Sequence, residues 1–361
     1  MKRILIIPAL ATLATAAVCG QSQGASAPSE KKYETRYAIG VIDDATLYSN
    51  LPAHAPATLN RVLVEPSAAL KIDDRLTLLT SLIEVSSTYD HTASQVFVRE
   101  TYAGLSAGDF DFTLGRKMVR WGTGYAFTAA GVLDPPRVPT DPSDRLNLNE
   151  GRDMVKADWV HGPHALTAGW STAALARTGT NMRDTTAVRY NVLVHGFDTS
   201  LIAGHDRGGD RFGALTFTRV VGQAWEVHGE AAWREEVAIL LGGKYTMRSG
   251  FTFIAEFFTP PNTPYFNRGV PPLSGRPHYA FLNAGKARLR ELPGWKEWDL
   301  SGSIVANLDD HSYTGVVDVN RWFGKHVSSY LHLEIPQGGR SSQYGAALYS
   351  AATSAGLRFQ L

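Results

Sequence analysis

The sequence predicts an all-β fold: a membrane-spanning, antiparallel, up-and-down β-barrel of about 18 strands, with 16 strands as the alternative. Three observations support this. Short segments with alternating apolar and polar residues recur from residue 33 to the end of the chain. The connections between these segments are alternately short and long. Beyond the first 20 residues, no apolar run approaches the roughly 20 residues that a spanning helix needs. If the chain crosses a membrane, it therefore crosses as strands.

The N-terminus has the layout of a secretory signal peptide. Lys2 and Arg3 precede an apolar run over residues 4–18, and small polar residues follow from Gly20. We expect residues 1–20 to be removed, which leaves residues 21–361 as a single barrel domain. The alternative is that Cys19 becomes a lipid-modified N-terminus, which Val18 fits poorly. Cys19 is the only cysteine, so after cleavage the chain would have no disulfide and no thiol nucleophile.

The formal charge of the whole chain is +1, and loss of Lys2 and Arg3 would make it −1. Such a small charge provides no overall attraction to nucleic acid or to an anionic surface. Binding partners must therefore be recognised by local groups of residues.

Alternation is clearest in the segments 224–233, 297–307, 327–335 and 353–361, since successive side chains of a strand point to opposite faces. In the first, Trp225, Val227 and Trp233 would face lipid, while Glu226 and Glu230 would face the interior. The last segment alternates up to the final residue, as expected for a closing strand. Weaker segments are 33–48, 59–71, 76–88, 95–103, 110–118, 153–160, 165–172, 186–194, 197–205, 211–219, 237–247, 250–258, 281–290 and 313–322. Whether the first two are full strands decides between 16 and 18.

The connections provide an independent test, because outer-membrane barrels have short periplasmic turns and longer external loops. The long or polar connections are 89–94, 119–152, 173–185, 206–210, 259–280, 308–312 and 336–352, and only the tight turn 234–236 breaks the alternation. Aromatic residues near strand ends are typical of a bilayer interface. A soluble β-sandwich or propeller also alternates, but it explains neither the signal peptide nor these loops, and no blade-length repeat is visible.

The connection 119–152 is the one long interruption, and we predict that it folds into the barrel mouth as a constriction loop. Its prolines restrict φ, and its glycines allow tight turns. Charged residues in or beside it are predicted to line the constriction: Arg116, Lys117, Arg120, Asp134, Arg137, Asp141, Asp144, Arg145 and Arg152. Such a mixed ring would set a transverse field and a size limit. Alternatively, the arginines pair with the carboxylates and hold the loop down.

Further charged residues are predicted to face the lumen from the barrel wall: Asp158, Arg189, Glu226, Glu230, Lys286, Arg288 and Arg290. The last three would form one row on a single strand face near the periplasmic end. That row would favour the passage of anions; the alternative is that it forms a solvated rim of the barrel.

The phrase Leu114-Gly115-Arg116-Lys117, followed by Trp121-Gly122, resembles a pattern of alginate-export-type and related porin-like channels. The constriction loop is also the third external loop, the position at which general porins fold a loop inward to narrow the pore. This resemblance implies a location in the bacterial outer membrane and passive, partly selective diffusion of small polar or oligomeric solutes. It implies contacts with outer-membrane lipid, lipopolysaccharide and the barrel-assembly machinery, and no cofactor, metal or nucleic acid. A homo-oligomer remains open.

Other classes of function have weaker support. Glu226 and Glu230 flank His228 on one strand face, which could suit acid/base or metal chemistry, but strand alternation explains them without catalysis. Gly242-Gly243-Lys244 lacks the earlier glycine of a phosphate-binding loop. We expect no enzyme. The alternatives are a structural or adhesion barrel with a closed lumen, and a transporter of hydrophobic compounds.

Overall fold

The computed structural model describes residues 33–51, 57–73, 75–87, 94–172, 184–234, 236–260, 277–290 and 292–361. These residues form one antiparallel sheet of 18 strands, in which β1 also pairs with β18, so the sheet closes into a barrel. The predicted fold class is confirmed. The proposed signal peptide lies outside the described residues. Within the described part of the chain, no helix is long and apolar enough to cross a membrane.

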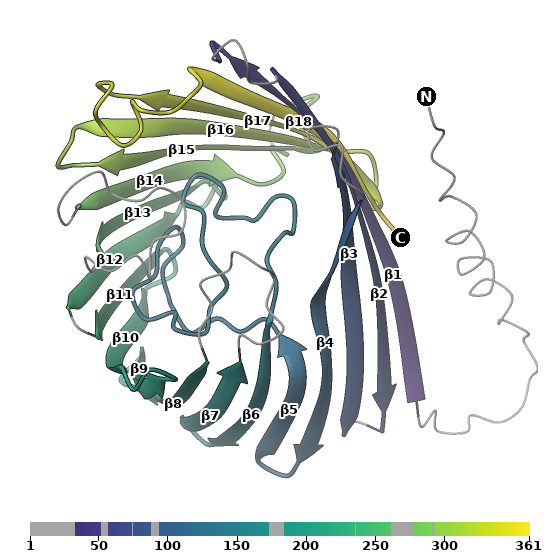
Figure 1. Ribbon diagram of the computed structural model, residues 1–361, viewed down its shortest axis with the longest axis vertical. Coiled ribbons are helices and arrows are strands. Elements are labelled where there is room, and N and C mark those ends of the chain that lie inside the picture. The colour runs from purple at the N-terminus through teal and green to yellow at the C-terminus, as the bar shows by residue number, and fades with distance from the viewer. Residues whose placement is uncertain are drawn as a thin grey trace, which may run out of the picture.

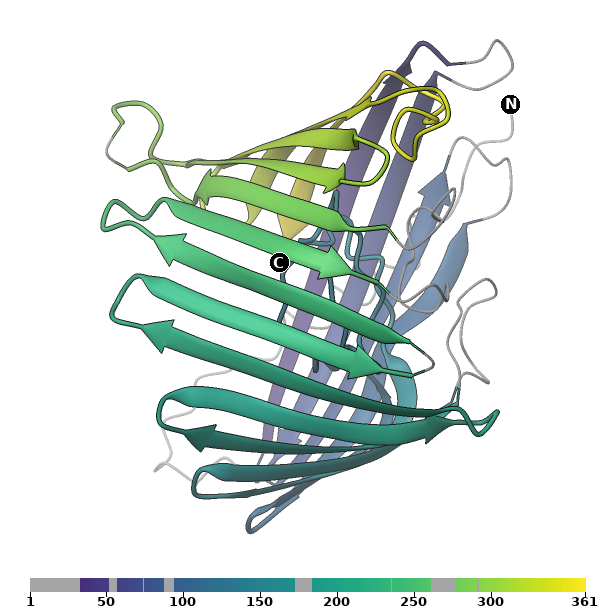
Figure 2. The ribbon, with the colours of Figure 1, turned by 90° about the vertical axis from the view of Figure 1, so that its left-hand side faces the viewer.

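The strands follow one another around the barrel in chain order (Figures 1 and 2). Their bounds are β1 Tyr33–Ser49, β2 Thr58–Ile72, β3 Leu76–Ser87, β4 Gln95–Ala107, β5 Phe110–Lys117, β6 Arg152–His161, β7 His164–Thr172, β8 Thr185–Val194, β9 Phe197–Asp206, β10 Arg211–Val221, β11 Trp225–Trp233, β12 Val237–Thr246, β13 Thr252–Thr259, β14 Tyr279–Lys286, β15 Trp298–Asn307, β16 Ser312–Trp322, β17 Val327–Gln337 and β18 Ala351–Gln360.

The closing seam uses the whole of the last strand. Gly40 pairs with Gln360 and Ser49 with Ala351, and the backbones of Ile39 and Leu361 exchange hydrogen bonds of 3.1 and 3.0 Å. Both β1 and β2 are full strands, which decides in favour of 18. Because every strand has two neighbours, the sheet has no open edge.

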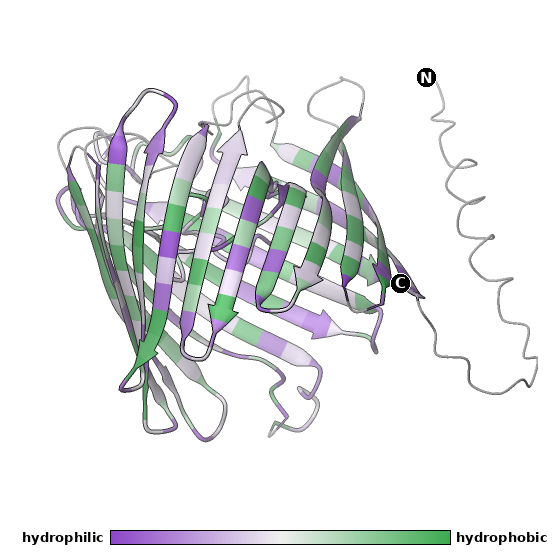
Figure 3. Ribbon diagram, turned by 90° about the horizontal axis from the view of Figure 1, so that it is seen from below, coloured by the Kyte–Doolittle hydropathy of each residue, from purple (hydrophilic) through white to green (hydrophobic). Residues whose placement is uncertain are grey.

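Apolar and polar residues alternate along the strands (Figure 3). On β11, the side chains of Trp225 and Trp233 are exposed on the outer wall, whereas those of His228 and Glu230 are buried on the inner side. The buried apolar clusters form where the inner wall meets the connection between β5 and β6, which we call the inner loop (residues 118–151). The interior is therefore filled in part by the chain itself.

Strand β14 differs from its prediction. It ends at Lys286, and its inward side chains are the buried Tyr279 and Phe281, while Leu282 is exposed on the outer wall. By alternation, Lys286 shares the face of Leu282, so the predicted inward row does not form. Arg288 has a φ of 57° and belongs, with Arg290, to the following turn. The reason is packing, because the inner loop covers this inner wall with apolar side chains.

Candidate constriction inside the barrel

The inner loop lies within the ring of strands (Figure 1). Its two ends are clamped at the wall by Arg116, whose guanidinium pairs with Asp153 at 2.7 Å and with Glu150 at 3.3 Å. The Gly151 amide also donates to the Arg99 carbonyl at 2.8 Å. By strand pairing, Arg116 lies opposite Thr101 and Asp153. Arg116 therefore fixes the base of the loop, and it is not among the residues that line the cavity described below.

At two positions, a neighbouring backbone carbonyl lies so close that only glycine fits. Gly115, inside β5, has a φ of 120°, and a side chain there would overlap the Thr101 carbonyl oxygen of β4. A side chain at Gly124 would overlap the Phe127 carbonyl oxygen. Gly115 thus lets the strand turn into the loop, and Gly124 lets the loop fold tightly against the wall.

Glu230 of β11 provides the densest contact between wall and loop. Its carboxylate is buried and accepts hydrogen bonds from both backbone and hydroxyl donors of the loop. The donors to one oxygen are the Thr123 amide, the Thr123 hydroxyl (3.2 Å) and the Gly124 amide (2.9 Å); those to the other are the Thr128 hydroxyl (2.9 Å) and the Ala129 and Ala130 amides (2.6 and 2.7 Å). Charge-assisted hydrogen bonds of this kind are stronger than neutral ones. One wall carboxylate thereby holds the turn 123–130.

Glu256 of β13 plays a similar part beside it. It accepts from the amides of Tyr125, Ala126 (2.9 Å) and Phe127 (3.3 Å), and from His228 Nε2 at 3.0 Å. Glu226 completes the group by accepting from the Tyr125 hydroxyl at 2.9 Å. Among the described residues, no group of histidine, cysteine and carboxylate side chains is arranged to hold a metal ion. The hydrogen bonds of Glu226 and Glu256 with residues 125–127 attach the loop to the wall.

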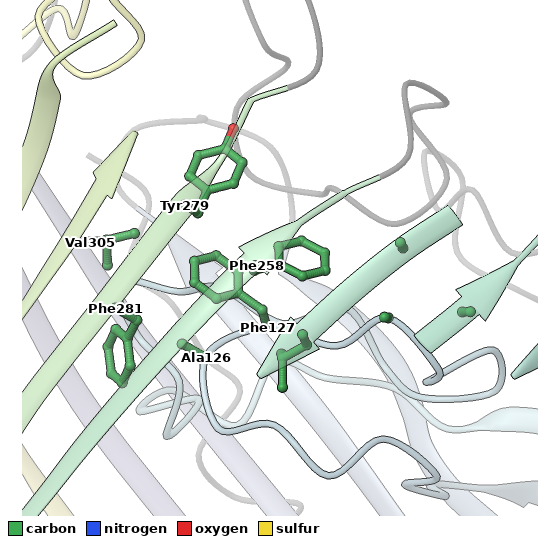
Figure 4. Packing of buried hydrophobic residues seen from close by; sticks show 10 residues of the cluster. Ala126, Phe127, Phe258, Tyr279, Phe281 and Val305 are labelled. Carbon is green, nitrogen blue, oxygen red and sulfur yellow. The ribbon is translucent and has the colours of Figure 1, made fainter. Parts of the chain in front are cut away.

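Apolar packing reinforces this attachment. The Phe127 ring stacks on Phe258, with centroids 5.0 Å apart and planes at 15°, and lies 5.6 Å from Tyr279 (Figure 4). Phe281 and Val305 belong to the same cluster. A second cluster joins loop residues to β8, β9 and β10 through Trp121, Ala130, Val132, Leu133, Ala187, Ile202 and Phe212. The wall from β8 to β15 thus holds the first half of the loop.

The second half of the loop reaches the opposite wall. Arg145 donates to the buried Asp44 of β1 at 2.8 Å, and its guanidinium lies 5.0 Å from the centre of the Tyr330 ring of β17. Leu146 is buried among side chains of β1 to β4. Asn147 donates to Glu65 of β2 at 3.2 Å. The loop therefore crosses the interior from one side of the barrel to the other.

Aspartates order the loop internally. Asp134 accepts from the amides of Trp121 (2.6 Å) and Gly122 (3.3 Å) and from Arg137 (3.2 Å). Burial raises the pKa of Asp134, and the neighbouring Arg137 acts against this shift. Asp141 accepts from the Arg145 amide, and Asp144 from the amides of Leu148 and Asn149. Of these contacts, the pair of Arg137 and Asp134 is the kind expected if arginines pair with the carboxylates and hold the loop down.

Beside the loop lies a cavity of about 450 Å³. Its charged lining residues are Arg61, Arg120, Asp134, Arg137, Asp141, Asp144 and Arg145. Arg120 is exposed, whereas the side chain of Asp134 is 1% exposed. Arg137 pairs with Asp134, and Arg61 and Arg145 pair with Asp44, so Arg120 is the exposed arginine of this lining.

The other predicted residues lie apart from this cavity. Arg152 donates to the Val132 carbonyl at 3.0 Å, and Lys117 lies 4.5 Å from the centre of the Tyr102 ring. Arg189 donates to Ser200 at 2.9 Å, and Asp158 accepts from Thr167 at 2.7 Å and pairs with Lys156. Arg288 pairs with Glu297 at the rim, and Arg290 is exposed. The wall residues Asp44 and Arg61 were not predicted. The sequence signal that could have identified them is that each is a charged residue on the polar face of a weakly alternating strand.

No protein-family model and no curated protein matches the chain. Solved structures do match. One is the outer membrane protein OpdK of Pseudomonas aeruginosa, with a TM-score of 0.62, 8% identity, and coverage of 91% of this chain and 98% of that one. OccK11 (OpdR) and OpdL of the same organism both have TM-scores of 0.61, with 10% and 11% identity. Each match covers 91% of this chain, and they cover 96% of OccK11 and 99% of OpdL. At these identities, the likeness is one of fold.

Proposed function

We propose that the protein is a channel of the bacterial outer membrane, through which small polar or oligomeric solutes diffuse passively and with partial selectivity. The single observation that carries the proposal is the inner loop, which is tied to opposite walls of a closed barrel of 18 strands. A barrel of this size is wide enough to hold water. A loop across its interior reduces that width to a passage of defined size.

The outer wall suits a bilayer. Large apolar side chains such as Leu241, Leu282 and Ile304 are exposed on it, and Trp225 and Trp298 lie at the start of their strands. An apolar band with aromatic residues at its borders is the pattern of outer-membrane barrels. The matched protein OpdK of Pseudomonas aeruginosa is itself an outer membrane protein. The short turns and both termini would face the periplasm, and the inner loop would enter from the external side.

Transport in this proposal needs no cofactor. A solute moves down its gradient through the cavity beside the inner loop, where fixed charges replace part of its hydration. Three arginines of the lining pair with carboxylates: Arg137 with Asp134, and Arg61 and Arg145 with Asp44. The exposed guanidinium of Arg120 is therefore the group that favours anionic over cationic solutes of equal size. The loop determines the largest solute that passes.

Deletion of residues 131–146 tests the constriction. The variant keeps the turn held by Glu230 and Glu256 but loses the crossing to Asp44, so single-channel conductance in planar bilayers should rise. Heat-modifiable migration on gels checks that the barrel still forms. Unchanged conductance through a folded barrel rules out the constriction role. Liposome swelling with sugars, amino acids and organic acids of graded size then defines the solute class.

A structural or adhesion barrel with a closed lumen is the second candidate, because the loop packs against both walls. The two functions predict different behaviour in the same bilayer. If the protein is a channel, the wild type itself conducts. If the lumen is closed, only the variant that lacks residues 131–146 conducts.

A further inference from the structure

The outer wall over β11 to β17 carries an apolar groove of about 870 Å³. Its floor is made of small outward residues, among them Ala284 and Gly302, which are paired neighbours on β14 and β15, and Gly315 on β16. Larger side chains such as Phe253 and Ile335 flank the floor. Polar groups contribute little to this lining, so the groove fits a hydrocarbon chain.

A cation stands at the periplasmic end of the same strands. Arg321 of β16 is exposed, and its guanidinium lies 5.2 Å from the centre of the Trp298 ring and 4.8 Å from that of Phe323. Trp298 and Arg321 are paired neighbours. Two aromatic rings attract the guanidinium by cation–π interaction, and its N–H groups can still donate to an oxyanion.

Strand geometry connects the two features. Arg321 and Gly315 lie on the same face of β16, six residues apart, which corresponds to roughly 20 Å along the strand. Likewise, Trp298 and Gly302 lie on one face of β15. The cation is therefore at the membrane border, and the groove floor is at the depth of lipid chains.

The surroundings of Arg321 are positive. Lys296 and Lys325, in the adjoining turns, are exposed, and so is Arg290. Among the described residues of the turn 287–297, the exposed carboxylate is Glu297, and it is paired with Arg288. Charge complementarity thus selects an anionic headgroup.

We propose that this surface binds one anionic phospholipid of the periplasmic leaflet, with its phosphate at Arg321 and an acyl chain in the groove over Gly302 and Gly315. The proposal rests on the placement of the barrel in the outer membrane, and it is independent of whether the lumen conducts. The guanidinium supplies paired donors to the phosphate oxygens. The groove supplies apolar contact along one chain.

Native mass spectrometry of the full chain, with added phosphatidylglycerol or phosphatidylcholine, tests the proposal. Wild type should retain one phosphatidylglycerol in preference to phosphatidylcholine. Arg321→Gln should lower that affinity about fivefold, the effect of one cation near an anionic surface. Arg219→Gln is the matched control, because Arg219 is exposed at the same end of the barrel and lies 4.5 Å from the centre of the Phe197 ring, outside the groove lining. It should retain the wild-type affinity.

Gly315→Leu tests the groove itself, because nothing lies within 4 Å of a side-chain carbon added there. This variant should fold normally and retain less of both lipids. Equal effects of the substitutions at Arg321 and Arg219, or no preference of wild type for phosphatidylglycerol, would overturn the proposal. So would an oligomer that Gly315→Leu dissociates, since a second copy would then occupy the groove. Wild-type conductance in these variants shows that the channel proposal stands separately.

Discussion

Replacing Glu230 with glutamine should loosen the inner loop without disturbing the barrel. In the wild type, both carboxylate oxygens accept from loop donors, including the amides of Thr123, Gly124, Ala129 and Ala130. Glutamine keeps one oxygen and puts an NH₂ group in place of the other. That NH₂ group is a donor that faces donors, so one pair of backbone amides loses its acceptor.

The size of the effect follows from that count. Each buried donor left without an acceptor costs about 1–3 kcal/mol, so two cost about 2–6 kcal/mol of the free energy that holds the loop to the wall. Even the lower figure raises the population of the detached loop roughly 30-fold. The barrel is spared because its strands pair through backbone hydrogen bonds, in which the Glu230 side chain takes no part.

Single-channel recording and limited proteolysis measure this change. E230Q should show a higher mean conductance or noisier open current, and its inner loop should be cleaved faster than in wild type. E226Q is the control on the same strand face, because its remaining oxygen can still accept from the Tyr125 hydroxyl. If E230Q keeps a quiet, wild-type current and full protease resistance, the carboxylate does not hold the loop.

Three further predictions concern the same loop. Phe127→Ala removes a buried ring and should destabilise the packed loop by about 3–5 kcal/mol, seen as faster proteolysis, whereas Phe257→Ala on the outer wall should leave proteolysis unchanged. The raised pKa of Asp134 means that the folded loop binds a proton more tightly than the unfolded chain. Its contribution to stability is therefore greatest at low pH and falls as the pH rises above 3.8; protease protection of Asp134→Asn should lack this slope, and an identical slope would contradict the assignment. Arg120→Gln should shift the reversal potential in a salt gradient toward cations, while Arg219→Gln outside the lumen should not; equal shifts would remove Arg120 from the permeation path.

The barrel was predictable where the two faces of a strand differ in chemistry. On β11, β15, β17 and β18, mainly apolar side chains form the outer face, and polar or small side chains form most of the inner face. Alternation therefore predicted both the strand and its orientation. On β14 this signal failed. Tyr279 and Phe281 face inward because Phe127 covers them, and Leu282 faces outward, so both faces are apolar. Local alternation cannot assign a face when the interior is filled by a distant apolar segment.

The loop was predictable in its existence but not in its attachments. Its length and prolines indicated an ordered insertion, and Glu226 and Glu230 were predicted to face inward. The pairing of Arg145 with Asp44 joins residues about a hundred positions apart, and a single sequence provides no means to match them. The interpretation in which arginines pair with carboxylates agrees with Arg137 and Asp134. The transverse field across the pore stays a prediction.

The contacts of Arg145 also bear on the order in which the molecule is assembled. Its backbone carbonyl accepts from Arg358, its guanidinium lies over Tyr330, and it binds Asp44, so residues near both ends of the polypeptide meet around a segment from its middle. These partners come together only when β18 pairs with β1. Contacts between residues so distant along the chain form late in folding. The inner loop therefore takes its final position only after β1 and β18 have paired. A barrel that has not yet closed at this seam would lack the finished constriction.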